Sequence, residues 1–132
     1  MLKLEIVTPE KRVLVTEAEE VVIPTASGEA GILTDHAPLI SELKPGILSY
    51  FGKNASARLV VAGGFVEVSD NRVAVLTDSA FFPEEIDLES ARSRRDAAEK
   101  QLAISADSPE NREAAQAERE FAEALIKLAE RK

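Results

Sequence analysis

Residues 71–95 read NRVAVLTDSAFFPEEIDLESARSRR, and this stretch decides the fold because two kinds of sequence meet in it. Its first part alternates apolar and polar residues, which is the period of a half-buried strand. Its second part begins a helical stripe at Leu88 and Ala91, and Asp87 is the predicted N-cap of that helix. We therefore expect the chain to change from strand to helix near Pro83.

The composition on the two sides of Pro83 differs in the same sense. All six glycines, all eleven valines and five of the six aromatic residues lie in residues 1–83, whereas residues 84–132 contain eleven alanines. Charged residues number 18 of 83 before the boundary and 22 of 49 after it. Valine and aromatic residues favour strands, and alanine favours helices. We expect a β domain over residues 1–84 and a helical domain over residues 85–132.

Short apolar runs separated by turn residues fill the first domain. The turn residues recur at spacings of about ten residues, a spacing typical of all-β sandwiches and barrels. Crossover helices between parallel strands are not indicated. The predicted fold class is an all-β sandwich of about ten short strands, followed by an antiparallel helical hairpin. The runs include EEVVIPT, GILSYFG, ARLVVAG and GFVEVS, with Ser27-Gly28, Lys44-Pro45-Gly46 and Gly63-Gly64 among the turns.

The second domain carries two helical stripes separated by SADSPEN. Ser108 is a predicted cap and Pro109 a predicted first helical residue. Only seven large apolar side chains support these helices, so we expect the hairpin to be weakly held in place. The first stripe contains Leu88, Ala91, Ala98 and Leu102, and the second contains Ala114, Ala117, Phe121, Leu125 and Leu128.

Composition excludes several function classes. The chain has no cysteine, which removes disulfides, thiolate zinc sites and cysteine nucleophiles. Its formal net charge of −8 disfavours direct binding to nucleic acid or anionic lipid. No run of apolar residues is long enough to span a bilayer. The residues alone therefore indicate a binding or assembly protein, and they do not name its partner.

Catalytic and ligand sites are weakly indicated. The only histidine, His36, lies in TDHAPL without a nucleophile motif, so a loop histidine is favoured over a catalytic base. A metal site built on His36 and Asp35 lacks ligand spacing. SGEAG lacks the Gly-Lys-Ser/Thr of a phosphate loop and is interpreted as a turn. Gly63-Gly64 is interpreted as a bulge or a close strand crossing.

Arg92, Arg94 and Arg95 form the one local excess of positive charge. Two interpretations stay open for them. They form the solvated face of a helix, or they contact an anion or an acidic partner.

The segment SGEAGILTDHAPL at residues 27–39 carries a specific resemblance. Together with KPG, AGGFVEV, VAVLTD, IDLESAR and the helical hairpin, it resembles the epsilon subunits of bacterial rotary ATP synthases over the whole chain. The resemblance implies a non-catalytic subunit of the central stalk. Its implied partners are the gamma subunit, the rotor ring and the catalytic beta subunit.

The resemblance also implies partner-interface residues. Glu29 matches the acidic position that faces the rotor ring, and His36 matches a histidine near the gamma contact. Gly31, Ala37 and Pro38 complete the motif and are assigned to the same interface. The implied function is to couple proton flow to ATP synthesis. The implied location is the cytoplasmic face of the bacterial inner membrane, with the membrane association indirect through the rotor.

In this family the hairpin has a state folded beside the sandwich and an extended state that blocks ATP hydrolysis. The resemblance therefore implies contacts of Arg92, Arg94 and Arg95 with an acidic segment of the beta subunit. Some members bind ATP between the helices, which makes Asp87, Ala91 and Arg92 candidate contacts here. Ser90 replaces the arginine of that motif, so no cofactor is predicted. The alternative function is a free-standing β-sandwich that binds another protein through its helices.

Overall fold

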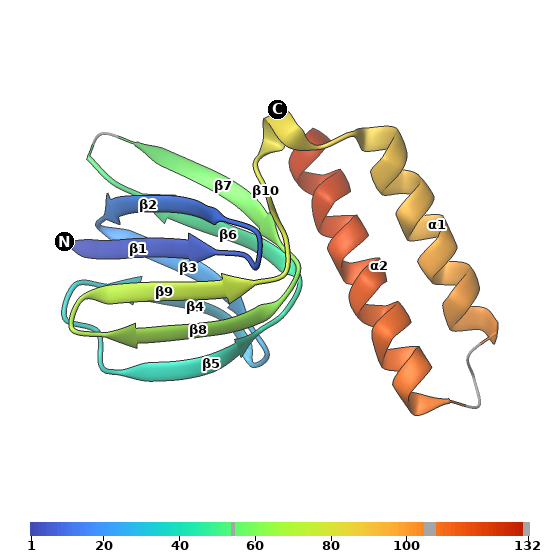
Figure 1. Cartoon of the computed structure of the whole chain (residues 1–132), viewed down its shortest axis with the longest axis horizontal. Coiled ribbons are helices and arrows are strands. Elements are labelled where there is room, and N and C mark those ends of the chain that lie inside the picture. Colours follow the sequence, from blue (N-terminus) through green and yellow to red (C-terminus); the bar gives the residue numbers. More distant parts are fainter. Residues whose placement is uncertain (54, 105–107, 131–132) are drawn as a thin grey trace.

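The computed structural model describes residues 1–53, 55–104 and 108–130, and in it a ten-stranded sandwich precedes a pair of helices (Figure 1). A short 3-10 helix, η1 (Pro83–Glu85), leads to α1 (Leu88–Ile104) and α2 (Pro109–Glu130). The predicted fold class is confirmed. The strands are β1 (Leu2–Val7), β2 (Arg12–Ala18), β3 (Glu20–Thr25), β4 (Gly28–Leu33), β5 (Leu39–Leu43), β6 (Gly46–Phe51), β7 (Ser56–Val61), β8 (Gly64–Ser69), β9 (Arg72–Thr77) and β10 (Ala80–Phe81).

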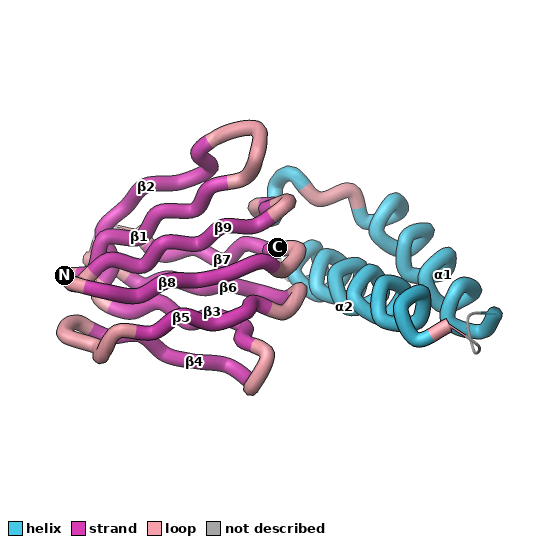
Figure 2. The backbone as a smooth tube through the Cα atoms, turned by 60° about the horizontal axis from the view of Figure 1, so that its bottom comes forward, coloured by secondary structure: helices cyan, strands magenta, loops and turns pink. Residues whose placement is uncertain are grey.

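The strands form two layers that are joined at one point. The first layer has the order β2-β1-β9-β8-β5, and the second has the order β4-β3-β6-β7-β10. The layers are connected where Thr25 of β3 pairs with Leu43 of β5. Strands β1 and β9 are parallel, and the other described pairs are antiparallel. Figure 2 shows the strands of both layers, with the helices beyond one end of the sandwich.

The sandwich core lies between the two layers. In β1 the side chains of Leu2, Leu4 and Ile6 are buried, whereas Lys3 is exposed and Glu5 half-buried, so the period-two prediction is confirmed there. The same alternation supplies the core residues of the other strands. They include Val21, Ile23, Ile32, Leu48, Leu59, Val61, Val66, Val68, Val73 and Val75.

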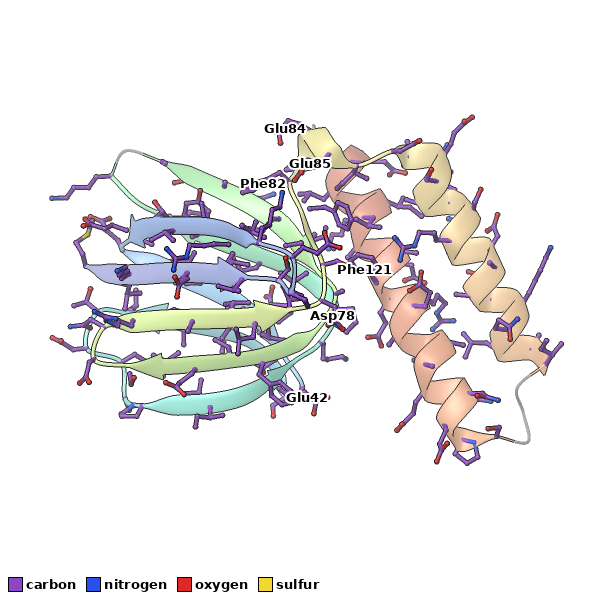
Figure 3. All side chains as sticks on the ribbon, viewed as in Figure 1. Glu42, Asp78, Phe82, Glu84, Glu85 and Phe121 are labelled. Carbon is purple, nitrogen blue, oxygen red and sulfur yellow. The ribbon has the colours of Figure 1, made fainter. Side chains whose placement is uncertain are left out.

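A second apolar cluster joins the hairpin to the sandwich. Ile47 of β6 lies beside Val60 of β7, and Val60 lies beside Phe81 of β10, so these three form one row on the outer face of the second layer, here called the docking row. Phe121 of α2 covers it, with its ring centroid 6.0 Å from that of Phe81 and an interplanar angle of 44°. Figure 3 labels Phe121 on α2 at this junction. Helix α2 therefore lies between the sandwich and α1.

Both helices begin where the sequence predicts. The Asp87 carboxylate accepts a hydrogen bond from Glu89 N at 3.0 Å, and the Ser108 hydroxyl accepts one from Asn111 N at 3.4 Å. These side chains satisfy amide groups that have no partner within the first helical turn.

The prediction that Ala114 belongs to the apolar stripe of the second helix is wrong. Ala114 is exposed, and its neighbour Ala115 is buried. The reason is that the cluster around the docking row contains residues of α2 only from Phe121 onward, where α1 packs on the other side of the helix. The predicted stripe continues the Phe121 side back to Ala114, beyond the part that the sandwich covers. A single stripe cannot describe such a helix.

We predict that residues 1–85 fold without the hairpin, because every member of the sandwich core cluster precedes Pro83. Glu85 is retained since its carboxylate accepts the amide of Phe82 at 2.9 Å. Circular dichroism should show a cooperative thermal transition, and the amide NMR spectrum should be dispersed. A Val60→Thr version of the same fragment controls for aggregation through the uncovered docking row. A molten spectrum in both fragments would contradict the domain boundary.

Candidate partner interfaces

The segment 27–39 runs along the length of the sandwich. It contains the end of the β3–β4 turn, the whole of β4 and the loop 34–38 that leads to β5. Glu29 lies near the start of β4, and His36 lies beyond its end. The structure therefore places these two predicted interface residues at opposite ends of one strand and does not bring them together. SGEAG is mostly strand, so its interpretation as a turn is wrong beyond Ser27.

Glu29 lies at the end of the sandwich that faces the hairpin. It is exposed and pairs with Pro24 in the ladder between β4 and β3. Lys44, together with Glu120 and Glu123 of α2, lines a shallow hollow of about 300 Å³ beside it. The predicted ring-facing carboxylate is therefore accessible to a partner and lies next to the docked helix.

Gly31 is two residues further along β4 and faces away from the core. It is exposed and pairs with Val22 of β3. A Cβ atom at this position would meet only the flexible end of Glu20, at 3.4 Å, so glycine is not required there by packing.

His36 belongs to a short, well-bonded loop. Its backbone amide donates to Leu33 O at 3.1 Å, and its ring Nδ1 lies 2.7 Å from Ala37 O. A carbonyl oxygen accepts only, so Nδ1 donates this hydrogen bond and Nε2 is the ring nitrogen not engaged in it. Ala37 and Pro38 follow and are exposed. The loop therefore presents one ring nitrogen and two small apolar side chains to a partner.

Sequence reasoning missed an apolar surface on the outer face of the first layer. Ile40 of β5, Phe65 of β8 and Leu76 of β9 are 75%, 59% and 57% exposed, and this surface is here called the uncovered face. Phe65 and Leu76 are direct cross-strand partners, and Ile40 lies opposite Glu67. The signal was present in GFVEV, where Phe65 is out of phase with the buried Val66 and Val68. Such patches mark interaction sites.

Gly64 shows why β8 approaches β9 closely. Its φ is +127°, and a Cβ atom there would overlap the backbone carbonyl of Leu76. Glycine is the residue that tolerates both conditions. For Gly63-Gly64 the sequence left a bulge or a close strand crossing open, and the structure shows a close approach of β8 to β9 at Gly64.

Two of the three clustered arginines bridge the helices. Arg94 Nε lies 2.8 Å from Glu118 Oε1, and the Arg94 guanidinium carbon lies 4.8 Å from the centre of the Phe121 ring. Arg92 lies 3.7 Å from the Glu130 carboxylate. Arg95 pairs instead with Asp96 of its own helix, at 3.2 Å. In this folded state the arginines are thus engaged with acidic groups of the same chain.

The candidate nucleotide contacts are engaged in other interactions or buried in this structure. Asp87 is engaged in capping α1, and Ser90 donates its hydroxyl hydrogen bond to Asp87 at 3.1 Å. Ala91 is buried in the helix seam, and Arg92 pairs with Glu130. The groove between the helices, of about 510 Å³, is lined elsewhere, by Arg94, Ala98, Gln101, Asn111, Ala115 and Glu118 among others.

The described part of the chain carries neither a cluster of metal ligands nor a helix that could cross a membrane. Residues 1–53, 55–104 and 108–130 contain no group of three or more potential metal-ligating side chains. Over the same ranges, neither α1 nor α2 combines the length and the apolar character needed to cross a bilayer.

Comparisons with known proteins identify relatives of the chain. The family model described as ATP synthase, Delta/Epsilon chain, beta-sandwich domain matches residues 1–83. A protein of Desulfitobacterium hafniense (strain Y51) named ATP synthase epsilon chain is 46% identical over 99 residues, which cover 75% of either chain. One of the same name from Rhodospirillum rubrum is 41% identical over 125 residues, which cover 94% of this chain and 92% of that one.

Chains in solved structures of ATP synthases have a fold similar to that of this chain. A chain of the Euglena gracilis mitochondrial ATP synthase, in a structure of its OSCP/F1/c-ring part, superposes with a TM-score of 0.78 at 27% identity and covers 94% of this chain and 78% of that chain. A chain of the Tetrahymena thermophila mitochondrial ATP synthase central stalk and c-ring has a TM-score of 0.68 at 21% identity, covering 97% and 96% of the two chains. The second likeness shows the fold alone.

We predict that Arg94→Ala weakens the association of the two helices, because it removes both the Glu118 pair and the contact with Phe121. The expected loss is about 1 kcal/mol, the sum of one surface ion pair and one exposed cation–π contact. Amide hydrogen exchange along α1 should accelerate accordingly. Arg95→Ala is the matched control, since Arg95 pairs within α1. Equal acceleration in both variants would show that Arg94 has no special place in the hairpin.

Proposed function

The chain belongs to the family of ATP synthase epsilon chains, which are accessory subunits of the central stalk and not the catalytic subunit, and on this premise we propose that it binds the gamma subunit and the rotor ring. In this role it turns with the rotor and helps to couple proton flow to ATP synthesis. Its hairpin inhibits ATP hydrolysis when it extends. Its association with the bacterial inner membrane is peripheral, on the cytoplasmic face, and runs through the rotor.

The observation that carries the proposal is the uncovered face. On the outside of the described sandwich lie the docking row and the uncovered face, both of them apolar. Helix α2 covers the docking row, whereas Phe65 and Leu76 are more than half exposed. At roughly 25 cal/mol for each Å² of apolar surface removed from water, covering such a surface favours association. We assign the uncovered face to the gamma subunit.

The two ends of β4 suit two different contacts. Glu29 lies at the hairpin-facing end and offers an exposed carboxylate, which fits the polar loops of a rotor ring. His36, Ala37 and Pro38 lie at the other end and fit the gamma subunit. Gly31 lies between them on the exposed side of the strand. A subunit that touches two rotor components needs contact residues spread in this way.

The hairpin is built as a separable element. Its inner helix α2 holds the sandwich through Phe121 on the docking row. Its outer helix α1 is held by α2, through buried alanines and the Arg94 contacts. A switch needs two states within a few kcal/mol of each other, and one docking contact of modest area is suited to that.

In this proposal the arginines contact acidic groups in both the docked and the extended state of the hairpin. In the docked state Arg92 and Arg94 pair with Glu130 and Glu118. In the extended state they, with Arg95, contact an acidic segment of the beta subunit. The exchange replaces one set of carboxylates by another, so its net free energy is small. Nucleotide has no part in the proposal, because Asp87 is engaged in capping α1.

We predict that changing both Phe65 and Leu76 to serine weakens binding to the rotor by about 30-fold, the effect of losing roughly 2 kcal/mol at the centre of an interface. The measurement is co-purification of tagged subunit with gamma and ring from detergent-solubilised membranes, followed by titration of purified gamma. The isolated variant should keep its melting temperature, because both side chains are exposed.

Ile104→Ser is the matched control for this double variant. Ile104 is 75% exposed but lies at the end of α1, away from the sandwich. It should bind gamma like the unchanged protein. Full co-purification of the double variant, or its absence for the unchanged protein, would overturn the proposed function.

We predict that Phe121→Ala increases inhibition of ATP hydrolysis by the assembled enzyme, whereas removal of residues 86–132 abolishes it. Loss of a buried phenylalanine costs about 3 kcal/mol of docking free energy, which favours the extended state. Phe51→Ala, at an exposed aromatic of β6, is the control. Reduced inhibition in Phe121→Ala would mean that the docked hairpin is itself the inhibitory state.

A further inference from the structure

A pair of hydrogen bonds ties the His36 loop to the turn between β8 and β9. The backbone amide of Asp35 donates to Asn71 Oδ1 at 2.6 Å, and Asn71 Nδ2 donates to Asp35 Oδ1 at 3.2 Å. The two residues are 36 positions apart in the chain. One amide side chain therefore holds both the backbone and the side chain of the residue that precedes His36.

The backbone around this contact is unusual. Asp35 has φ +67°, Asp70 has φ +49° and Asn71 has φ +59°, all in the left-handed region. Asn and Asp enter this region more readily than other non-glycine residues. The Asn71 carbonyl accepts a hydrogen bond from Lys3 N at 2.8 Å, which fixes the turn against β1. Asn71 thus connects a turn anchored on a core strand to the loop.

The strand ladders do not hold this loop by themselves. The pairing of β5 with β8 ends at Leu39 and Val68, and the pairing of β4 with β3 ends at Leu33 and Glu20. Residues 34–38 lie beyond both ends. Their described anchors are the amide bond from His36 to Leu33 and the two bonds with Asn71.

We propose that Asn71 is a positioning residue for partner binding, which holds the loop 34–38 in the shape that presents His36, Ala37 and Pro38 to the gamma subunit. The inference rests on the proposed function, because it takes this loop as a gamma contact. Ordering a loop before association reduces the entropy lost on binding. Hydrogen bonds at an exposed site contribute little to folding, so Asn71 affects affinity more than stability.

The test uses variants that separate the amide group from the backbone conformation. Asn71→Gly keeps the left-handed conformation and removes the amide. Asn71→Asp keeps an acceptor for the Asp35 amide but places two carboxylates together. Adding Asp35→Asn to Asn71→Asp restores a donor and an acceptor with the original net charge. Asp70→Gly is the matched control, since Asp70 also has a positive φ and lies in the same turn.

Two measurements follow each variant. In the isolated subunit, amide exchange at positions 35 and 36 should accelerate in Asn71→Gly and return in the swapped pair, with little change in melting temperature. In titrations with purified gamma, Asn71→Gly and Asn71→Asp should lose about fivefold to tenfold in affinity, the scale of one or two hydrogen bonds. The swapped pair should recover the affinity, and Asp70→Gly should retain it.

The outcomes distinguish this inference from the proposed function. If the Phe65 and Leu76 double variant loses affinity while Asn71→Gly keeps it, the positioning role is wrong and the gamma interface stands. If Asn71→Gly loses affinity only together with a large fall in melting temperature, or if the swapped pair fails to recover, Asn71 is merely structural. If no variant changes binding, the proposed function itself fails.

Discussion

The burial of the docking row under α2 determines where both helices lie on the sandwich. The three side chains of the docking row, Ile47, Val60 and Phe81, project outward from the second layer. They would be exposed to water if Phe121 did not cover them. Once α2 occupies that face, α1 is left to pack on the far side of α2. The buried alanines and the Arg94 contacts of the hairpin therefore serve to hold α1 to a helix that is already in place.

Strands β3 and β4 run along the sandwich from one of its ends to the other. Strand β3 belongs to the second layer and reaches the first at Thr25, and β4 follows it along its whole length. The consequence is that Glu29 and His36, seven residues apart, lie at opposite ends of the domain. One short motif can therefore serve two contacts. Neither side chain is needed to fill the core, which leaves both free for recognition.

Sequence patterns predicted the parts of this structure that depend on local chemistry. Asp87 and Ser108 were predicted as caps because capping needs only the residue and the turn that follows it. Alternation placed Leu2, Leu4 and Ile6 inward for the same reason. The misjudged residues depend on tertiary partners. Ala114 was misplaced because the docking row covers α2 only from Phe121 onward. For Arg92 and Arg94 the sequence left the partner open, because the acidic groups with which they pair lie on the other helix. The uncovered face was missed because a single outward phenylalanine does not indicate an apolar surface. Only the strand pairing brings Phe65 beside Leu76.

The docking row also sets the order in which the molecule is assembled. Its three residues come from β6, β7 and β10, so the surface that receives α2 does not exist until those strands have paired. The sandwich is rich in contacts between distant residues, which form slowly, whereas a helical hairpin forms quickly from its own neighbours. Synthesis from the N-terminus delivers the helices after the strands. The docking row is therefore exposed to water after the strands have paired, until α2 has been made and covers it.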